Sequence, residues 1–181
     1  MCYYGYMERV RISKKSKDIK EIRKLYDTSF PNEERIPFVH LVSSLSKDRI
    51  IDAYYEEGKL MGMTVIFLSD DLEYLSYICI ERSFQGRGYG TRILNQIKQE
   101  YPDNRIVVDI EETEYSRENL GEKIRRKEFY MRNGFVPARV FYTYAGVEYE
   151  LMCCNGMIIK DDWQKIMRKH WGKYADYATY R

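Results

Sequence analysis

Histidine and cysteine are scarce in this chain of 181 residues, which has 2 and 4 of them respectively. The histidines, His40 and His170, lie far apart, and no C-x-x-C pair occurs. A zinc cage needs four such ligands at close spacing, so the sequence predicts no metal site. We expect the cysteines to act as small buried hydrophobic residues, and they are Cys2, Cys79, Cys153 and Cys154.

Long hydrophobic runs are also missing. The longest largely apolar run extends from Leu60 to Leu68, about half the length that a helix needs to cross a bilayer. Residues 1–7 contain no basic segment followed by an apolar stretch, so they do not resemble a secretory signal. The sequence therefore predicts a cytoplasmic protein without a membrane partner.

Charge of one sign is not in excess, because 30 Lys and Arg face 28 Asp and Glu, a net charge of +2. A protein whose main work is nucleic-acid binding normally carries a strong basic excess, so we expect no nucleic-acid partner. Charge is nevertheless uneven locally. One acidic run contains Asp109, Glu111, Glu112, Glu114 and Glu118. It indicates either a solvated loop or the mouth of a site that attracts a cation.

Hydrophobic periodicity divides the chain into alternating strands and helices. Strand patterns cover residues 8–13, 50–56, 59–68, 73–81, 105–111, 135–144 and 147–154. Helix patterns cover 18–30, 37–45, 91–101, 122–132 and 161–169, the first with Asp18 as its N-cap. Hydrophobic residues make up 44% of the chain, enough for one core. We predict a single α/β (α+β) domain over residues 1–181, with its core over about 8–154 and a C-terminal helix and tail over 160–181.

The most informative segment is a glycine-rich loop between the strand over 73–81 and the helix over 91–101. It reads Gln85, Gly86, Arg87, Gly88, Tyr89, Gly90. Alternate glycines leave backbone amides unshielded, and the following helix adds free N–H groups and the positive end of its dipole. This arrangement suits a pyrophosphate. Neither a P-loop nor a dinucleotide fingerprint fits, because Thr91-Arg92 follows and the third glycine is misplaced.

The order Gln-x-x-Gly-x-Gly resembles the acetyl-CoA signature of the GNAT acetyltransferase family. The segment from Glu128 to Phe135, an aromatic pair followed by Gly-Phe, is similar to the family's second signature. The resemblance covers about residues 8–154 and implies a mixed, mostly antiparallel sheet of about seven strands flanked by helices. Where the family often has Asn and Ala near the start of the helix over 122–132, the chain has Lys123 and Arg126.

The resemblance implies that acetyl-CoA is the cofactor. Its pantetheine arm would pair with the strand at Ile78, Cys79 and Ile80, and a backbone N–H near Ile80 would hold the oxyanion. Its pyrophosphate would lie on the glycine loop. The implied phosphate-binding residues are Gln85, Gly86, Arg87, Gly88, Tyr89, Gly90 and Thr91.

Acyl transfer to an amine needs a base, because primary amines have a pKa near 10. With histidine scarce, carboxylates are the candidates. Asp109 and Glu111 share one face of the strand over 105–111; we favour Glu111, and Glu73 is a third possibility. The family pattern implies Tyr130 as the general acid for the departing thiolate, with Arg126 one turn earlier able to lower its pKa.

The first functional interpretation is an N-acetyltransferase acting on the amine of a small molecule. Two alternatives stay open: a protein or peptide N-acetyltransferase that modifies a Lys or N-terminal amine, and a CoA-binding module without catalysis. Residues 30–38 and the last hairpin would decide the acceptor. The sequence leaves a homodimer open.

Overall fold

A computed structural model describes residues 6–32, 35–113 and 119–181. In these residues eight strands form one mixed, mostly antiparallel sheet in the order β1-β2-β3-β4-β5-β7-β6-β8, together with five α-helices. The predicted fold class is confirmed. The eighth strand, β8 (Thr179–Tyr180), lies in the C-terminal segment, where the sequence shows no strand pattern, and pairs with β6.

The elements follow the predicted order along the chain. They are β1 (Met7–Arg11), α1 (Ile19–Ser29), α2 (Phe38–Ser43), β2 (Arg49–Glu56), β3 (Lys59–Ser69), β4 (Leu72–Ile80), α3 (Tyr89–Glu100), β5 (Arg105–Glu111), α4 (Leu120–Arg132), β6 (Val136–Tyr144), β7 (Val147–Cys154) and α5 (Lys160–Trp171). The largest difference that concerns the glycine loop is the start of α3. It begins at Tyr89, before the expected Thr91, so the end of the glycine loop already belongs to the helix.

The chain divides into two compact units. Unit 1 contains residues Met1–Ile66 and Leu75–Gln99, and unit 2 contains Phe67–Tyr74 and Glu100–Arg181. Strands β3 and β4 contribute residues to both units. The assignment of residues 1–181 to a single domain stays a prediction.

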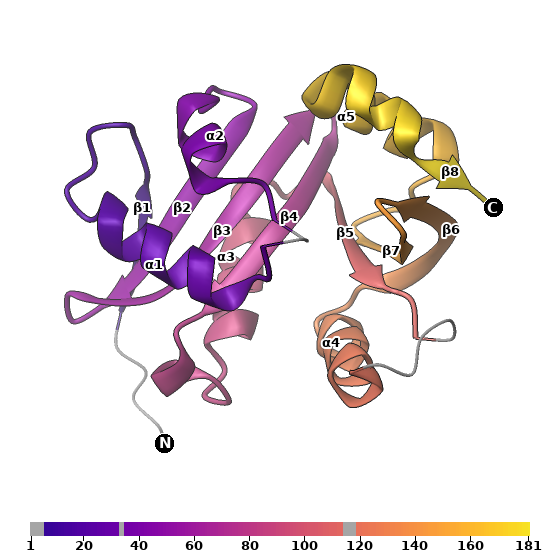
Figure 1. The fold of residues 1–181 in the computed structure, drawn as a ribbon. Helices are drawn as coiled ribbons and strands as arrows, with labels where there is room; N and C mark the ends of the chain where they lie inside the picture. The colour runs from indigo at the N-terminus through magenta and orange to yellow at the C-terminus, as the bar shows by residue number, and fades with distance from the viewer. Residues whose placement is uncertain (1–5, 33–34, 114–118) are drawn as a thin grey trace. The chain divides into compact units, whose positions relative to one another are not determined.

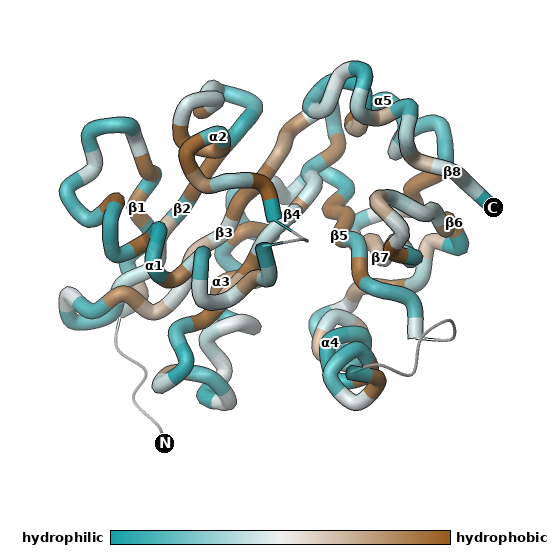
Figure 2. Tube along the Cα trace, in the orientation of Figure 1, coloured by the Kyte–Doolittle hydropathy of each residue, from teal (hydrophilic) through white to brown (hydrophobic). Residues whose placement is uncertain are grey.

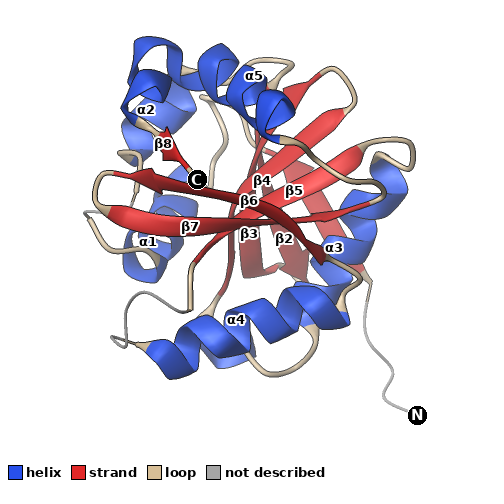
Figure 3. Cartoon of the chain, turned by 90° about the vertical axis from the view of Figure 1, so that its right-hand side faces the viewer, coloured by secondary structure: helices blue, strands red, loops and turns tan. Residues whose placement is uncertain are grey.

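In unit 1, helices α1 and α2 cover one face of the strands and α3 covers the other (Figures 1 and 3). Strand β3 is buried along most of its length, and Figure 2 shows the contrast between this hydrophobic strand and the hydrophilic loop before α1. Asp18 stands at the N-cap of α1, but its side chain makes no cap hydrogen bond. The predicted capping role is wrong, because this carboxylate accepts a hydrogen bond from the Tyr55 hydroxyl instead (3.2 Å).

Glycine has a specific task at one turn and one close approach of unit 1. The β2–β3 hairpin turns through Glu57 and Gly58, both with positive φ (51° and 73°), as in the tight hairpin turns that favour glycine. On β3, a Cβ at Gly62 would lie 2.6 Å from the carbonyl oxygen of Cys79. This position therefore lets β3 approach β4 closely.

In unit 2, β5 lies between a parallel and an antiparallel neighbour. It pairs in parallel with the first residues of β4, from Leu72 with Arg105 to Tyr74 with Val107, and antiparallel with β7. Helices α4 and α5 lie on opposite sides of these strands (Figures 1 and 3). Trp163 of α5 is fully buried in this core.

Three further expectations concern the cysteines, membrane-spanning helices and metal sites. Cys79, Cys153 and Cys154 are buried and free, as predicted, and Cys2 lies outside the described residues. No helix in the described part of the chain is long and apolar enough to span a membrane. Within the same residues, no three His, Cys, Asp or Glu side chains are grouped so as to hold a metal ion.

Candidate active site

The glycine loop of unit 1 connects the end of β4 to the N-terminus of α3. Gly86 and Gly88 both have positive φ, 73° and 82°, a conformation that glycine adopts at no steric cost. A Cβ at Gly86 would meet nothing within 4 Å, so this glycine serves the backbone conformation and not close packing. Residues 85–88 are exposed. The loop thus presents its backbone to solvent at the N-terminus of a helix of twelve residues, where an anion is stabilised.

Side chains of the loop hold it to the strand that precedes it. Gln85 donates a hydrogen bond from Nε2 to the carbonyl oxygen of Ile80 (2.9 Å). The Arg87 guanidinium lies over the Phe84 ring, 5.8 Å from its centroid, and Thr91 is exposed in the first turn of α3. Arg87 and Thr91 are therefore accessible to an anion, whereas the Gln85 side-chain amide is already hydrogen-bonded to the end of β4.

The second half of β4 differs from the first. Its start, Leu72–Leu75, is buried, whereas Ser76, Tyr77, Ile78 and Ile80 keep part of their surface exposed. The family resemblance implies that a pantetheine arm would pair with Ile78, Cys79 and Ile80; Ile78 and Ile80 are partly accessible, whereas Cys79 is buried. Burial raises the pKa of the Cys79 thiol to about 11, so this thiol stays protonated at neutral pH and is a poor nucleophile.

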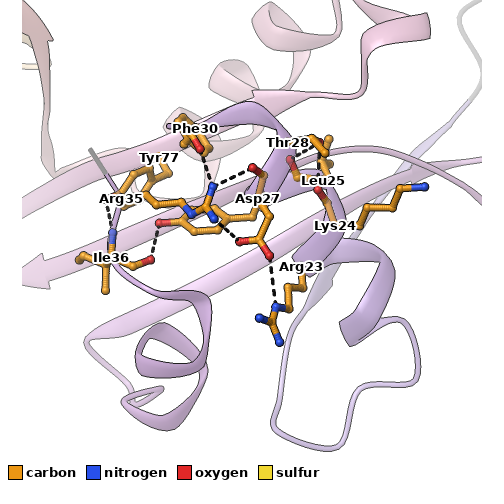
Figure 4. A network of polar contacts seen from close by, with 10 residues as sticks. Arg23, Lys24, Leu25, Asp27, Thr28, Phe30, Arg35, Ile36 and Tyr77 are labelled. Carbon is orange, nitrogen blue, oxygen red and sulfur yellow. Dashed lines mark hydrogen bonds and ion pairs between the residues drawn. The ribbon is translucent and has the colours of Figure 1, made fainter. Parts of the chain in front are cut away.

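On the α1 side of unit 1, arginine and tyrosine side chains hold the connection between α1 and α2 (Figure 4). Arg35 donates from Nη1 to the carbonyl oxygens of Asp27 (2.7 Å) and Phe30 (2.6 Å). The backbone of Ile36 is bound on both sides: its N–H donates to the Tyr77 hydroxyl (3.1 Å), and its carbonyl accepts from the Tyr26 hydroxyl (2.9 Å). The part of the 30–38 segment that is described is thus fixed on α1 and β4.

In unit 2, Tyr130 lies in the last turns of α4, where the sequence placed it. Its side chain is buried and its ring packs edge-on against Phe135 with centroids 5.3 Å apart. Burial raises the pKa of its hydroxyl, Arg126 lowers it, and Asp109 raises it, with a net upward shift. Arg126 acts in the predicted direction, but burial outweighs it.

Glu111, the favoured base, ends β5 between two cations of α4. Its Oε2 lies 2.8 Å from Lys123 Nζ, and its Oε1 lies 3.4 Å from Arg126 Nη1. Lys123 is itself buried. A buried ammonium needs a paired anion, so Glu111 neutralises Lys123, one of the two residues that depart from the family pattern.

Asp109 lies in a different environment on the same strand. Its Oδ1 accepts from the Tyr74 hydroxyl (2.8 Å) and its Oδ2 from the Tyr142 hydroxyl (2.7 Å). Burial raises its pKa, and the two tyrosine hydrogen bonds only partly oppose this. The carboxylate remains a hydrogen-bond acceptor with free lone pairs, since each oxygen has two.

The other predicted acids are also engaged or enclosed. Glu112 pairs with Arg181 at the C-terminus, and Glu73 is fully buried on β4. Glu114 and Glu118 lie outside the described residues. The described acids of the run are therefore bound to partners of unit 2, which weakens the interpretation of this run as a free acidic mouth.

The sequence did not reveal several side chains that organise these groups. Tyr74 and Tyr142 bind Asp109 from positions 35 and 33 residues away. Glu56, at the end of β2, accepts a hydrogen bond from the Tyr89 hydroxyl and pairs with Arg92. Nothing in their local pattern distinguishes these residues, because each contact joins elements that are more than 30 residues apart in the chain.

Solved structures provide a comparison for the fold. A protein from Bacteroides thetaiotaomicron assigned to the GNAT family is 19% identical, with 93% of this chain and 98% of that chain covered and a TM-score of 0.74. An aminoglycoside 6'-N-acetyltransferase complexed with coenzyme A is 17% identical, with 81% and 95% covered and a TM-score of 0.64. The ribosomal-protein-S18-alanine N-acetyltransferase of Escherichia coli is 14% identical, with 85% and 98% covered and a TM-score of 0.59. At these identities the likeness shows the fold alone.

The family follows from the sequence comparison. No curated protein matches the chain. The family model described as the acetyltransferase (GNAT) domain matches residues 47–137, a range that includes β4, the glycine loop and α4 with Tyr130. The chain belongs to the GNAT acetyltransferase family.

Proposed function

We propose that this protein is an N-acetyltransferase that moves an acetyl group from acetyl-CoA to the amine of a small molecule by direct attack. The amine nitrogen forms a bond to the thioester carbonyl carbon and gives up a proton to a base. The carbon–sulfur bond then breaks, and the CoA thiolate takes a proton from a general acid. A cytoplasmic location stays a prediction, as does the homodimer.

The glycine loop carries this proposal. Its exposed backbone, the positive φ of Gly86 and Gly88, and its place at the N-terminus of α3 fit a pyrophosphate. Arg87 and Thr91 would add side-chain donors, and the partly exposed Ile78 and Ile80 would pair with the pantetheine arm. Acetyl-CoA supplies the activated acyl group, and three of the solved structures with this fold contain acetyl-CoA or CoA.

For the base we favour Asp109 over Glu111. Glu111 is held by Lys123 and Arg126, and proton uptake there would leave Lys123 without its anion. Asp109 is bound only by neutral hydroxyl groups in the contacts described, and its pKa is raised. A raised carboxyl pKa brings the base closer to the pKa of the amine that it must deprotonate.

For the general acid we retain Tyr130. Its raised pKa makes proton release harder, so Tyr130 would act only as negative charge develops on the sulfur. The raised pKa also has an advantage: the hydroxyl carries its proton at neutral pH, so the acid is ready before each turnover.

The aromatic side chains beside the α1–α2 connection support a small amine as the acetyl acceptor. Phe30 and Tyr77 are partly exposed, with ring centroids 4.9 Å apart. Aromatic faces bind apolar groups and ammonium ions alike, which suits a small amine with an apolar part.

A screen of small amines and of peptides with Lys or N-terminal amines tests this function, with release of the CoA thiol as the signal. We expect turnover on a small amine. Tyr130→Phe should lower kcat about 100-fold, the usual contribution of a positioned acid. Tyr174→Phe is the control, since Tyr174 is exposed in unit 2 and should keep wild-type kcat.

Each other outcome has a distinct meaning. Turnover on peptides alone would replace the small-molecule acceptor with a protein one. CoA binding without turnover on any amine would favour a non-catalytic module. Equal kcat for Tyr130→Phe and Tyr174→Phe would remove Tyr130 from the mechanism.

A further inference from the structure

Tyr89 is the residue of the glycine loop whose side chain is turned into unit 1. Residues 85–88 are exposed, whereas Tyr89 is only 8% exposed. Its hydroxyl donates to Oε2 of Glu56, the last residue of β2. On its other side the ring meets Phe84 edge-on, with centroids 5.8 Å apart. The side chain of Tyr89, a residue expected to contact the cofactor, therefore packs beneath the loop and binds Glu56.

Arg92 completes this arrangement one turn along α3. Its Nη1 lies 2.8 Å from Oε1 of Glu56, and its guanidinium carbon lies 5.0 Å from the centroid of the Tyr89 ring. The two oxygens of one carboxylate thus hold the first and fourth residues of α3. The hydrogen bonds from Tyr89 and Arg92 lower the pKa of Glu56, so the carboxylate stays charged at neutral pH.

The first turn of α3 needs such an anchor. Glycine loses more conformational freedom on ordering than any other residue, and a loop with three glycines does not fix its own amides. Their positions depend on where the helix begins. A binding site that is ordered before the ligand arrives avoids the cost of ordering it on binding. Arg92 also compensates the charge of Glu56, so the carboxylate does not repel an anion at the helix N-terminus.

We propose that Glu56 is a positioning residue for the phosphate-binding loop, and that it acts through Tyr89 and Arg92 to fix the first turn of α3 for the CoA pyrophosphate. This inference rests on the proposed function, because it takes CoA as the ligand of the loop. Glu56 itself does not touch the ligand.

The chain supplies a matched control on the same strand. Tyr55, the neighbour of Glu56, donates its hydroxyl to Oδ2 of Asp18 (3.2 Å). Neighbouring residues of a strand point to opposite faces, so this contact lies on the α1 side and away from α3. It is also a hydrogen bond between a tyrosine and a carboxylate, in the same unit. The Tyr55–Asp18 pair therefore has the chemistry of the Tyr89–Glu56 pair without its position.

The test measures CoA binding by calorimetry and Tm for four variants of the full chain. They are Glu56→Gln, Tyr89→Phe, Asp18→Asn and Tyr55→Phe. We expect Glu56→Gln to raise the Kd for CoA about tenfold, the affinity equivalent of one hydrogen bond to a charged group. Tyr89→Phe should raise it about fivefold, and the two control variants should keep the wild-type Kd while losing a similar amount of Tm.

The double variant Glu56→Gln/Tyr89→Phe shows whether the two residues act as one unit. If they do, the fold-increase in its Kd for CoA should be smaller than the product of the fold-increases in the two single variants. Independent, multiplicative effects would overturn the proposed route through Tyr89. If a Glu56 variant is poorly folded, Tyr89→Phe alone still gives the answer, since it removes a single oxygen atom and keeps the ring packed.

The outcomes separate this inference from the proposed function. A wild-type chain that fails to bind CoA overturns the proposed function. A wild-type chain that binds CoA, with Glu56→Gln and Tyr89→Phe binding equally well, overturns the positioning role alone. Equal losses of CoA affinity in the control pair would show a general effect of stability and would also overturn it.

Discussion

The glycine loop of unit 1 and the carboxylates of β5 in unit 2 are built from different parts of the chain. The loop presents backbone groups, and its conformation depends on glycines with positive φ at positions 86 and 88. On β5 the candidate groups are side chains, and each differs in its contacts: hydroxyl groups bind Asp109, and cations pair with Glu111. A backbone site can be inferred from local sequence, whereas the role of a side chain depends on distant residues.

The two carboxylates of β5 show how strongly partners matter. Asp109 and Glu111 lie on the same face and are separated by one residue. Burial raises the pKa of Asp109, and its two hydroxyl partners and Arg126 only partly oppose this, whereas Glu111 is paired directly with Lys123 and Arg126. We infer opposite consequences for the two residues, activity for the first and stability for the second.

The largest expected effect separates these two residues. Asp109→Asn should lower kcat/KM about 100-fold at neutral pH, because it removes the proposed base. Glu111→Gln should leave kcat/KM close to wild type but cost about 2 kcal/mol of stability, since it leaves the buried Lys123 without its anion. Steady-state rates and chemical denaturation measure the two quantities. The reverse pattern, with Glu111→Gln inactive and Asp109→Asn active, would restore Glu111 as the base.

The same pair gives a pH test of the raised pKa. The folded chain holds the Asp109 proton more tightly than the unfolded chain, in which the pKa is about 3.9. The contribution of Asp109 to stability therefore falls as the pH rises from about 4 through the folded pKa. In Asp109→Asn this falling part of the stability curve should be absent. An unchanged curve in the variant would contradict the burial of this charge.

A smaller effect tests the backbone nature of the glycine loop. Gly86 and Gly58 have the same φ of 73°, and neither has an atom within 4 Å of an added Cβ. Gly86→Ala and Gly58→Ala should therefore each cost about 1 kcal/mol, through the left-handed backbone alone. Only Gly86→Ala should weaken CoA binding, by about tenfold, as the loop amides lose their convergence. Denaturation and calorimetry would show this, and equal CoA affinity in both variants would remove the loop from the cofactor site.

The same distinction explains how far the sequence could be interpreted. The glycine loop was predictable because strand, glycines and helix are consecutive, and the hairpin turn at Glu57-Gly58 was predictable for the same reason. The proposed anchor of the loop was not, since Glu56 and Tyr89 are 33 residues apart and Glu56 stands in no recognisable motif. Sequence spacing placed Asp109 and Glu111 on one face correctly, but it could not show which would meet hydroxyl groups and which would meet cations.

Local sequence pattern also failed at two places, the N-cap of α1 and the strand β8. Asp18 precedes α1 as a capping residue should, yet its carboxylate binds Tyr55 of β2. The β8 strand was missed because its two residues carry no pattern of their own and are ordered by pairing with Tyr142 and Thr143 of β6. In both cases a contact with a strand that is distant in the chain decides the structure.

The smallest expected effect concerns two arginines that share one carboxylate in unit 1 (Figure 4). Arg23 is 63% exposed and meets Asp27 within one helix, whereas Arg35 is 16% exposed and also binds two backbone carbonyls. We expect Arg35→Gln to cost about 1 kcal/mol, because two part-buried carbonyls lose a charged donor. Arg23→Gln should cost less than about 0.5 kcal/mol, as exposed ion pairs do. Denaturation at low and high salt measures both, and salt should reduce only the Arg23 contribution. Equal costs would mean that the α1–α2 connection is held by its tyrosines, so that the contacts of Ile36 with Tyr26 and Tyr77 suffice without Arg35.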